Sequence, residues 1–214
     1  MTVPVLAVAV CALVAGLAAW ALNDFMLRHA ESDAAILRRY LQVPVAAVLG
    51  GLAGLAGSWA ESLAFVALAV AASLLTVIDL AEERLPDAIV LPLIPVTFVL
   101  LTLAAWATGD WWALLRSLEA GAALFAFVFL MMIFAPDLGF GDVKFAAVTG
   151  AFCGWFGWGA VLLGFAAAWF TFAALGVALL ATRKRHGRSS YAFGPFMILG
   201  AVLGVFWAGA VLAW

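Results

Sequence analysis

Long apolar runs follow one another along almost the whole chain, and they decide what it can fold into. A helix that crosses the hydrocarbon core of a bilayer needs about 20 apolar residues, or about 17 when it is short. Two of the runs, 43–57 and 144–158, fall short of that length. Six others reach it, at residues 3–22, 60–78, 89–107, 112–134, 160–181 and 192–213. The sequence therefore predicts an all-α polytopic membrane protein with about eight transmembrane helices, with six or seven as alternatives.

Composition excludes a soluble domain. Hydrophobic residues make up 68% of the 214 residues, charged residues make up 10%, and the mean hydropathy is +1.21. A soluble domain is about half apolar and about one quarter charged. The longest polar segment, 23–42, leaves no room for a second folded domain, so we expect one transmembrane domain over 1–214. No basic residue precedes the first run, which predicts a retained span rather than a cleaved signal.

The placement of charges predicts the orientation. If all eight runs cross the membrane, the loops on one side are 23–42, 79–88, 135–143 and 182–191. These loops, with Lys144 at the boundary of one of them, hold nine of the ten Lys and Arg residues, and Arg116 is the exception. Basic residues collect in cytoplasmic loops. We therefore predict that these loops face the cytoplasm and that both termini lie outside.

Glycine and tryptophan residues predict where helices pack and turn, and which residues lie at the outer membrane surface. Glycine-rich residues 50–57 predict close helix packing, and breaks at 57–58 and 154–159 predict tight turns between helices. Indole rings prefer the interface between lipid and water, so an outer aromatic belt is expected. Its members are Trp59, Trp106, Trp111, Trp112, Trp155 and Trp158.

Two aspartates lie at the cytoplasmic ends of predicted spans. Asp79 ends the third span and Asp142 opens the sixth, which gives both the same depth. Ionisable groups at such positions are functional candidates, although each can also be an ordinary loop carboxylate. Two carboxylates brought together cannot both ionise easily, so one acts as a base towards water while the other supplies a proton. This chemistry requires no metal or other cofactor.

Two glycines come directly before the second aspartate, in the sequence GFGD. Gly139 and Gly141 would let an extended substrate backbone pass Asp142 without meeting a Cβ atom. A flexible turn between two spans is the alternative interpretation. We predict no metal site, because Cys11 and Cys153 lie in apolar runs without a CxxC partner, and the two histidines lie in basic loops.

Four segments together resemble a known family. They are GFGD at 139–142, DLAEERLPD at 79–87, the continuation GDVKFAAVTGAFCG, and YAFGPFMILGAVLG at 191–204. In this order they resemble the type IV prepilin peptidases, which are membrane aspartyl proteases with a GxGD signature. The resemblance covers residues 79 to 204.

The resemblance implies a function and a set of site residues. Members of the family remove the short leader of prepilins and pseudopilins of type IV pili and protein secretion systems. They do so at the cytoplasmic face of the bacterial plasma membrane, which makes these substrates and the bilayer the expected partners. The resemblance implies that Asp79 and Asp142 form the catalytic dyad. It assigns supporting roles to Gly139, Gly141, Lys144, Pro86 and Asp87.

The first part of the chain departs from the longer members of the family. Those members carry two CxxC pairs that bind zinc between the first two spans, whereas segment 23–42 contains no cysteine. The resemblance therefore implies a short form, with degenerate N-terminal spans over 1–58 and a catalytic core over 60–213. Longer members also N-methylate the new terminus, and the missing module argues against that second activity.

Two other classes of protein share some of these features. A presenilin-like intramembrane protease shares GxGD, but it is expected to carry YD and PAL motifs that this chain lacks. An ion-coupled transporter would use buried carboxylates to relay protons, and it would be expected to show internal repeats that we do not find here. Nucleic-acid binding has no support, because the basic residues fit the orientation rule.

Overall fold

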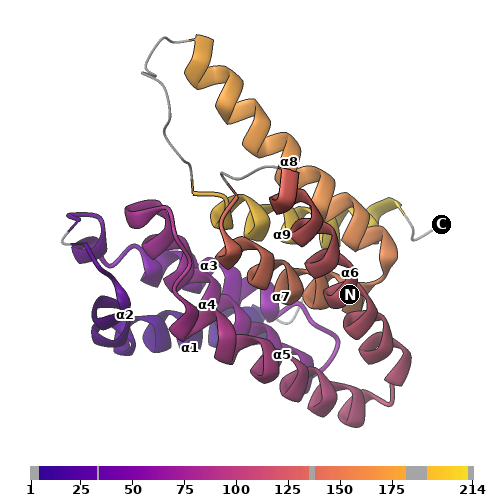
Figure 1. The fold of residues 1–214 in the computed structure, drawn as a ribbon. Helices are drawn as coiled ribbons and strands as arrows, with labels where there is room; N and C mark the ends of the chain where they lie inside the picture. The colour runs from indigo at the N-terminus through magenta and orange to yellow at the C-terminus, as the bar shows by residue number, and fades with distance from the viewer. Residues whose placement is uncertain (1–4, 33, 135–137, 182–191, 212–214) are drawn as a thin grey trace. The chain divides into compact units, whose positions relative to one another are not determined.

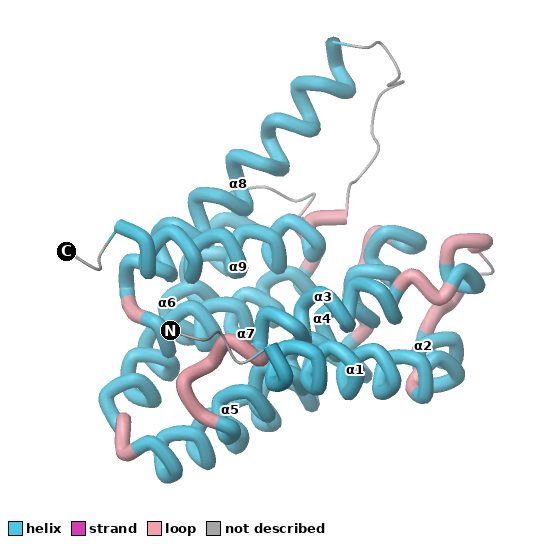
Figure 2. Tube along the Cα trace, turned by 180° about the vertical axis from the view of Figure 1, so that it is seen from behind, coloured by secondary structure: helices cyan, strands magenta, loops and turns pink. Residues whose placement is uncertain are grey.

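The computed structural model describes residues 5–32, 34–134, 138–181 and 192–211 (Figure 1). Throughout these ranges the regular structure is helical, and no strand occurs in them (Figure 2). The chain divides into two compact units, Met1–Trp111 and Trp112–Trp214, and each is described by itself. The basic segment 182–191, which the orientation argument used, lies outside the described residues.

Each of the eight apolar runs corresponds to one helix. A seven-residue helix α2 (Asn23–His29) and a short 3-10 helix η1 (Leu37–Arg39) lie in segment 23–42, which was expected to be a loop. The fold class is therefore confirmed as all-α. The helices that match the runs are α1 (Val5–Ala21), α3 (Gln42–Ala53), α4 (Trp59–Glu82), α5 (Asp87–Thr108), α6 (Trp111–Phe134), α7 (Phe140–Phe156), α8 (Trp158–Ala181) and α9 (Gly194–Val211).

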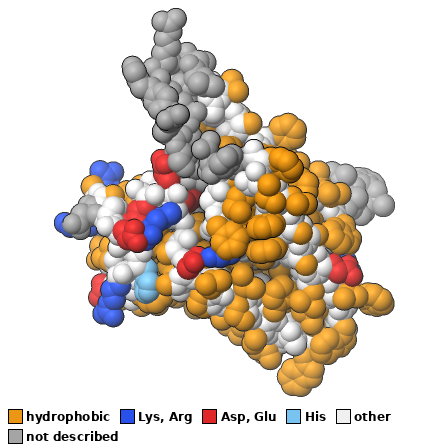
Figure 3. Space-filling model, viewed as in Figure 1, with side chains coloured by type: hydrophobic (Ala, Val, Ile, Leu, Met, Phe, Trp, Pro, Cys, Tyr) orange, Lys and Arg blue, Asp and Glu red, His pale blue; other side chains and the backbone are white. Residues whose placement is uncertain are grey.

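Four of these helices, α4, α5, α6 and α8, are long and apolar enough to cross a membrane. Helices α1 and α2 add a fifth crossing if they count as one span, bent by 50° between them. Hydrophobic side chains dominate the face seen in Figure 3. The protein is a multi-pass membrane protein, while the number of eight spans and the side of the termini stay predictions.

Glycines bring the helices of the first unit close together. A Cβ atom on Gly54, the C-cap residue of α3, would lie 2.7 Å from the Cα atom of Val8 and 2.8 Å from the carbonyl oxygen of Ala7, both on α1. The prediction that residues 50–57 serve helix packing is thereby confirmed. Helix α4 packs against α1, α3 and α5. It begins at a capping interaction, in which Ser58 Oγ accepts the N–H of Glu61 at 3.2 Å.

Glycines play the same part in the second unit. A Cβ atom on Gly204 of α9 would lie 2.5 Å from the carbonyl oxygen of Ala160 and 2.5 Å from the Cα atom of Gly164, both on α8. Helix α7 approaches α6 as closely, because a Cβ atom on Gly150 would meet the carbonyl oxygen of Ala120 at 2.6 Å. These contacts are with backbone atoms, so a side chain here would push the helices apart.

The turn between α7 and α8 consists of one residue, Gly157. Its φ of 125° and ψ of 167° lie in a region that is essentially reserved for glycine. The predicted tight turn within 154–159 is confirmed.

The arginine that broke the charge pattern has a structural partner. Arg116 of α6 donates to the carbonyl oxygen of Trp155 at 3.2 Å and to that of Gly154 at 3.4 Å. These carbonyls lie in the last turn of α7, where a cation is favoured by hydrogen bonding and by the helix dipole. Trp155 is only 5% exposed, so its prediction as a member of an exposed belt is wrong. The other five belt tryptophans are exposed.

We expect Gly204→Ala to lower the stability of the second unit by about 1–3 kcal/mol, because the new methyl group overpacks the contact between α8 and α9. The thermal unfolding midpoint in detergent, followed by tryptophan fluorescence, measures this. Gly209→Ala on the same helix is the matched control, since a Cβ atom there has nothing within 4 Å. Equal midpoints for the two variants would contradict the packing argument.

Candidate functional site

Asp79 lies in the last turn of α4 and is only 2% exposed. Its carbonyl oxygen accepts the N–H of Glu83 at 2.7 Å, and Glu83 ends the helix with a left-handed φ of 54°. This is a common way to close a helix, because the left-handed residue turns the chain away while the last carbonyls stay bonded. The first aspartate is thus held at a helix end, with its side chain out of contact with solvent.

Pro86 and Asp87 start the next helix. Pro86 is buried and has an extended conformation at the N-cap of α5, where its carbonyl oxygen accepts the N–H groups of Ile89 and Val90. Proline suits this position because it has no N–H to satisfy and a fixed φ. Asp87 is exposed in the first turn, where the helix dipole favours a negative charge. Both residues therefore shape the turn that follows Asp79.

Asp142 lies in the first turn of α7 and is half-buried. The N-cap of this helix is Gly139, and the main chain of Gly139 hydrogen-bonds to the Asp142 carboxylate. An acidic side chain that reaches back in this way to the N-cap is one half of a capping box. Residues Phe140–Asp142 are helical, so of GFGD only Gly139 belongs to the connection before α7.

The glycine at the N-cap is explained by space rather than by backbone conformation. With φ −72° and ψ 146°, Gly139 has an extended backbone that any residue adopts. A Cβ atom on Gly139 would lie 3.3 Å from Oδ2 of Asp142, which is closer than a comfortable contact. The missing side chain therefore leaves the carboxylate room on this side. Gly141 lies in the first helical turn beside it.

Lys144 is buried one turn into α7, with 9% of its surface exposed. Its Nζ atom lies 4.5 Å from the centre of the Phe140 ring. That ring packs against Phe129 of α6 in an edge-to-face arrangement, with 6.4 Å between the ring centres. A cation over an aromatic face is stabilised by the ring quadrupole, more so when it is shielded from water. The positive charge of Lys144 is thus held two residues from Asp142.

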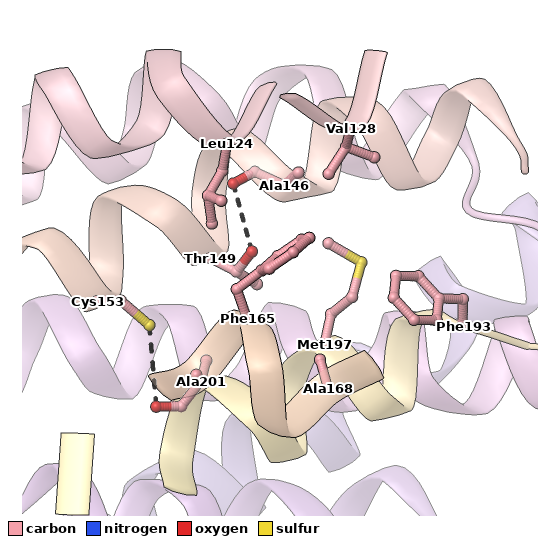
Figure 4. Close-up of a pocket in the computed structure, with 11 residues that line it drawn as sticks. Leu124, Val128, Ala146, Thr149, Cys153, Phe165, Ala168, Phe193, Met197 and Ala201 are labelled. Carbon is pink, nitrogen blue, oxygen red and sulfur yellow. Dashed lines mark hydrogen bonds between the residues drawn. The ribbon is translucent and has the colours of Figure 1, made fainter. Parts of the chain in front are cut away.

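A small apolar cavity in the second unit is lined by residues of α6, α7, α8 and α9 (Figure 4). Its volume of about 20 Å³ corresponds to about one water molecule. Thr149 and Cys153 face it, and each has a backbone carbonyl acceptor, at 3.3 Å and 3.9 Å. With its polar groups satisfied, the cavity is a packing feature of the core.

The residues of segment 23–42 do not fit the zinc module of longer prepilin peptidases, because the segment has no cysteine. Cys11 and Cys153 lie on α1 and α7, in different units. Among the described residues, no three His, Cys, Asp or Glu side chains form a group that could hold a metal ion.

The predicted site residues fall into two groups. Asp79, Pro86 and Asp87 lie around the turn between α4 and α5, in the first unit. The second unit holds the other group, at the start of α7, which consists of Gly139, Gly141, Asp142 and Lys144. The approach of the two groups to each other is therefore a proposal, taken up below. Sequence reasoning missed Glu82 and Arg84, whose contacts lie with a segment about fifty residues earlier.

We expect the Lys144 ammonium and the Phe140 ring to stabilise each other by about 0.5–2 kcal/mol. A double-mutant cycle of unfolding free energies with Lys144→Met and Phe140→Leu measures this coupling. A control cycle pairs Lys144→Met with Phe134→Leu, because Phe134 is 85% exposed at the end of α6. The interaction would be refuted if the two cycles gave the same coupling.

Comparison with known proteins identifies relatives. The model of the type IV leader peptidase family matches residues 66–214, which include both aspartates. A prepilin leader peptidase/N-methyltransferase of Legionella pneumophila is 29% identical over 142 residues, covering 65% of this chain and 48% of the relative. Its counterpart in Pseudomonas putida is 27% identical over 164 residues, covering 73% of this chain and 54% of the relative.

The chain spans about half the length of the curated relatives it matches. No solved structure matches it. The match to the family model covers well over half of the chain, from within α4 to the last residue. The chain therefore belongs to the type IV leader peptidase family.

Proposed function

We propose that this protein is a membrane-embedded aspartyl endopeptidase that removes the N-terminal leader of prepilin-like proteins at the cytoplasmic face of the bacterial plasma membrane. The observation that carries the proposal is the family match, which includes Asp79, Asp142 and the segments around them. Both aspartates lie at helix ends, which favours a cut near the membrane surface over one within a substrate helix.

Asp79 and Asp142 act together on one water molecule. The ionised carboxylate takes a proton from water while the water oxygen bonds to the carbonyl carbon of the substrate, and the protonated partner gives its proton to the carbonyl oxygen. When the tetrahedral intermediate collapses, the C–N bond breaks, and the amine takes the proton that came from water. The partner recovers its own proton from the intermediate, so the pair returns to its starting state.

The surroundings of the two aspartates suit these roles. Asp79 is only 2% exposed, so a water molecule held beside it is shielded from bulk solvent. The space left by Gly139 gives a substrate backbone access to the Asp142 carboxylate. A buried cation at Lys144 supplies positive charge near a reaction that develops negative charge on oxygen.

The proposed substrate is a protein with a short N-terminal leader before a hydrophobic helix, either a pilin or a pseudopilin. The curated relatives are named for leader cleavage and for N-methylation. We propose the first activity only, because segment 23–42 lacks the cysteines that the resemblance associates with the second.

Asp79→Asn and Asp142→Asn should each abolish leader cleavage, since an amide neither accepts the proton of water nor donates as a carboxylic acid does. Co-expression with candidate prepilins, followed by mass spectrometry of the mature N-terminus, measures cleavage and any methylation. Asp110→Asn is the matched control, because Asp110 lies in the turn between α5 and α6, at the far end of α5 from Asp79. Full activity of either dyad variant would refute the mechanism.

Gly139→Ala should reduce cleavage by roughly tenfold or more while the protein remains folded, because the methyl group displaces the Asp142 carboxylate from its working position. Gly176→Ala is the control, since a Cβ atom there has nothing within 4 Å. Rates of leader cleavage in detergent, normalised to folded protein, compare the two. If both variants cleaved at the same rate, the clearance at Gly139 would have no catalytic importance.

A further inference from the structure

A buried carboxylate, that of Glu82, lies three residues after Asp79 and accepts hydrogen bonds from three different residues. Oε1 of Glu82 accepts the N–H groups of Glu31 and Ser32, each at 2.7 Å. Its other oxygen, Oε2, accepts the Nε–H of Arg84 at 2.9 Å. The Glu82 side chain is only 4% exposed, while its backbone donors at Glu31 and Ser32 lie at the surface, and all three contacts are charge-assisted hydrogen bonds.

Arg84 connects the same two parts of the chain a second time. Its Nη1 atom lies 2.7 Å from Oε1 of Glu31, and its Nη2 donates to the carbonyl oxygen of His29 at 3.5 Å. Neighbouring Glu82 is the largest cause of the raised pKa of Arg84. Segment 29–32, which comprises the last residue of α2 and the three residues after it, is thereby connected to the end of α4.

Segment 29–32 is connected to the same end of α4 that contains Asp79. A last helical turn has carbonyls without intrahelical partners and tends to fray. Here the backbone leaves α4 at Glu83, between the two residues that make the long-range contacts. Contacts that hold Glu82 and Arg84 in place therefore also hold the last turn of α4, which contains Asp79. All of these residues belong to the first unit.

The contacts are not equal in strength. Glu31 has a side chain that is 73% exposed, and exposed ion pairs contribute little. Removal of the Glu82 carboxylate, by contrast, would leave the N–H groups of Glu31 and Ser32 and the Nε–H of Arg84 without this acceptor. The expected order of importance is Glu82, then Arg84, then Glu31.

We propose that Glu82 and Arg84 are positioning residues, which hold segment 29–32 against the end of α4 and so keep Asp79 in its reactive orientation. This inference rests on the proposed function and deepens it. Neither residue is given a contact with substrate, so their loss should act on the chemical step.

The kinetic test compares Glu82→Gln and Arg84→Gln with two controls, Glu83→Gln and Arg39→Gln. The controls remove the same charges from exposed side chains of the first unit. We expect kcat for leader cleavage, per folded molecule, to fall by roughly tenfold to a hundredfold with little change in KM. Arg84→Lys should recover part of the loss, because it restores the charge but not the planar fork of donors.

A second measurement does not depend on activity. Hydrogen exchange of the Glu31 and Ser32 amides in the full-length protein should be faster in Glu82→Ala than in Glu83→Ala, because only the first removes their acceptor. Unchanged exchange would show that the contacts are not formed in solution and would overturn the inference.

The outcomes separate this inference from the proposed function. If Asp79→Asn and Asp142→Asn are inactive while Glu82→Gln and Arg84→Gln match their controls, the positioning role is refuted and the peptidase proposal stands. If the wild-type protein cleaves none of the prepilins, the peptidase proposal fails, and with it the catalytic part of the inference. Faster exchange together with a selective loss of kcat supports the positioning role.

Discussion

A bilayer offers no hydrogen-bond partners to peptide groups, and the rest of this structure follows from that constraint. A segment that crosses the hydrocarbon must satisfy its backbone internally, which a helix does. Without a hydrophobic force between helices in lipid, they associate through close contacts. Gly54 on α3 and Gly204 on α9 provide such contacts, one in each unit.

Helical spans also decide where chemistry can be located. Charged groups are costly in the hydrocarbon, whereas helix ends combine access to water with fixed backbone groups. Asp79 is held by the closing turn of α4, and Asp142 by the opening turn of α7. Each aspartate therefore lies in a capped turn of its own helix, and Gly139 leaves space beside the Asp142 carboxylate.

Local patterns predicted the helices and the position of both aspartates at helix ends, because run length and short motifs are properties of neighbouring residues. The catalytic role of the two aspartates stays a proposal. Predictions failed where the answer depends on contacts. Glycines usually signal a turn, yet Phe140–Asp142 of GFGD are helical, and the main chain of the N-cap residue Gly139 hydrogen-bonds to the Asp142 carboxylate. Trp155 was assigned to an exposed belt, yet it is buried, and its carbonyl oxygen accepts from Arg116. The contacts of Glu82 join segments about fifty residues apart, and no pattern among neighbouring residues predicts them.

The central claim is that Asp79 and Asp142 meet in the membrane-embedded protein. Disulfide cross-linking tests it directly, with Asp79→Cys and Asp142→Cys combined in a background that carries Cys11→Ser and Cys153→Ala. We predict an intramolecular cross-link that keeps the two halves joined after proteolysis between them, and none for a control pair of Asp79→Cys with Asp110→Cys. The account would be contradicted if both thiols of the first pair reacted with a maleimide but formed no cross-link.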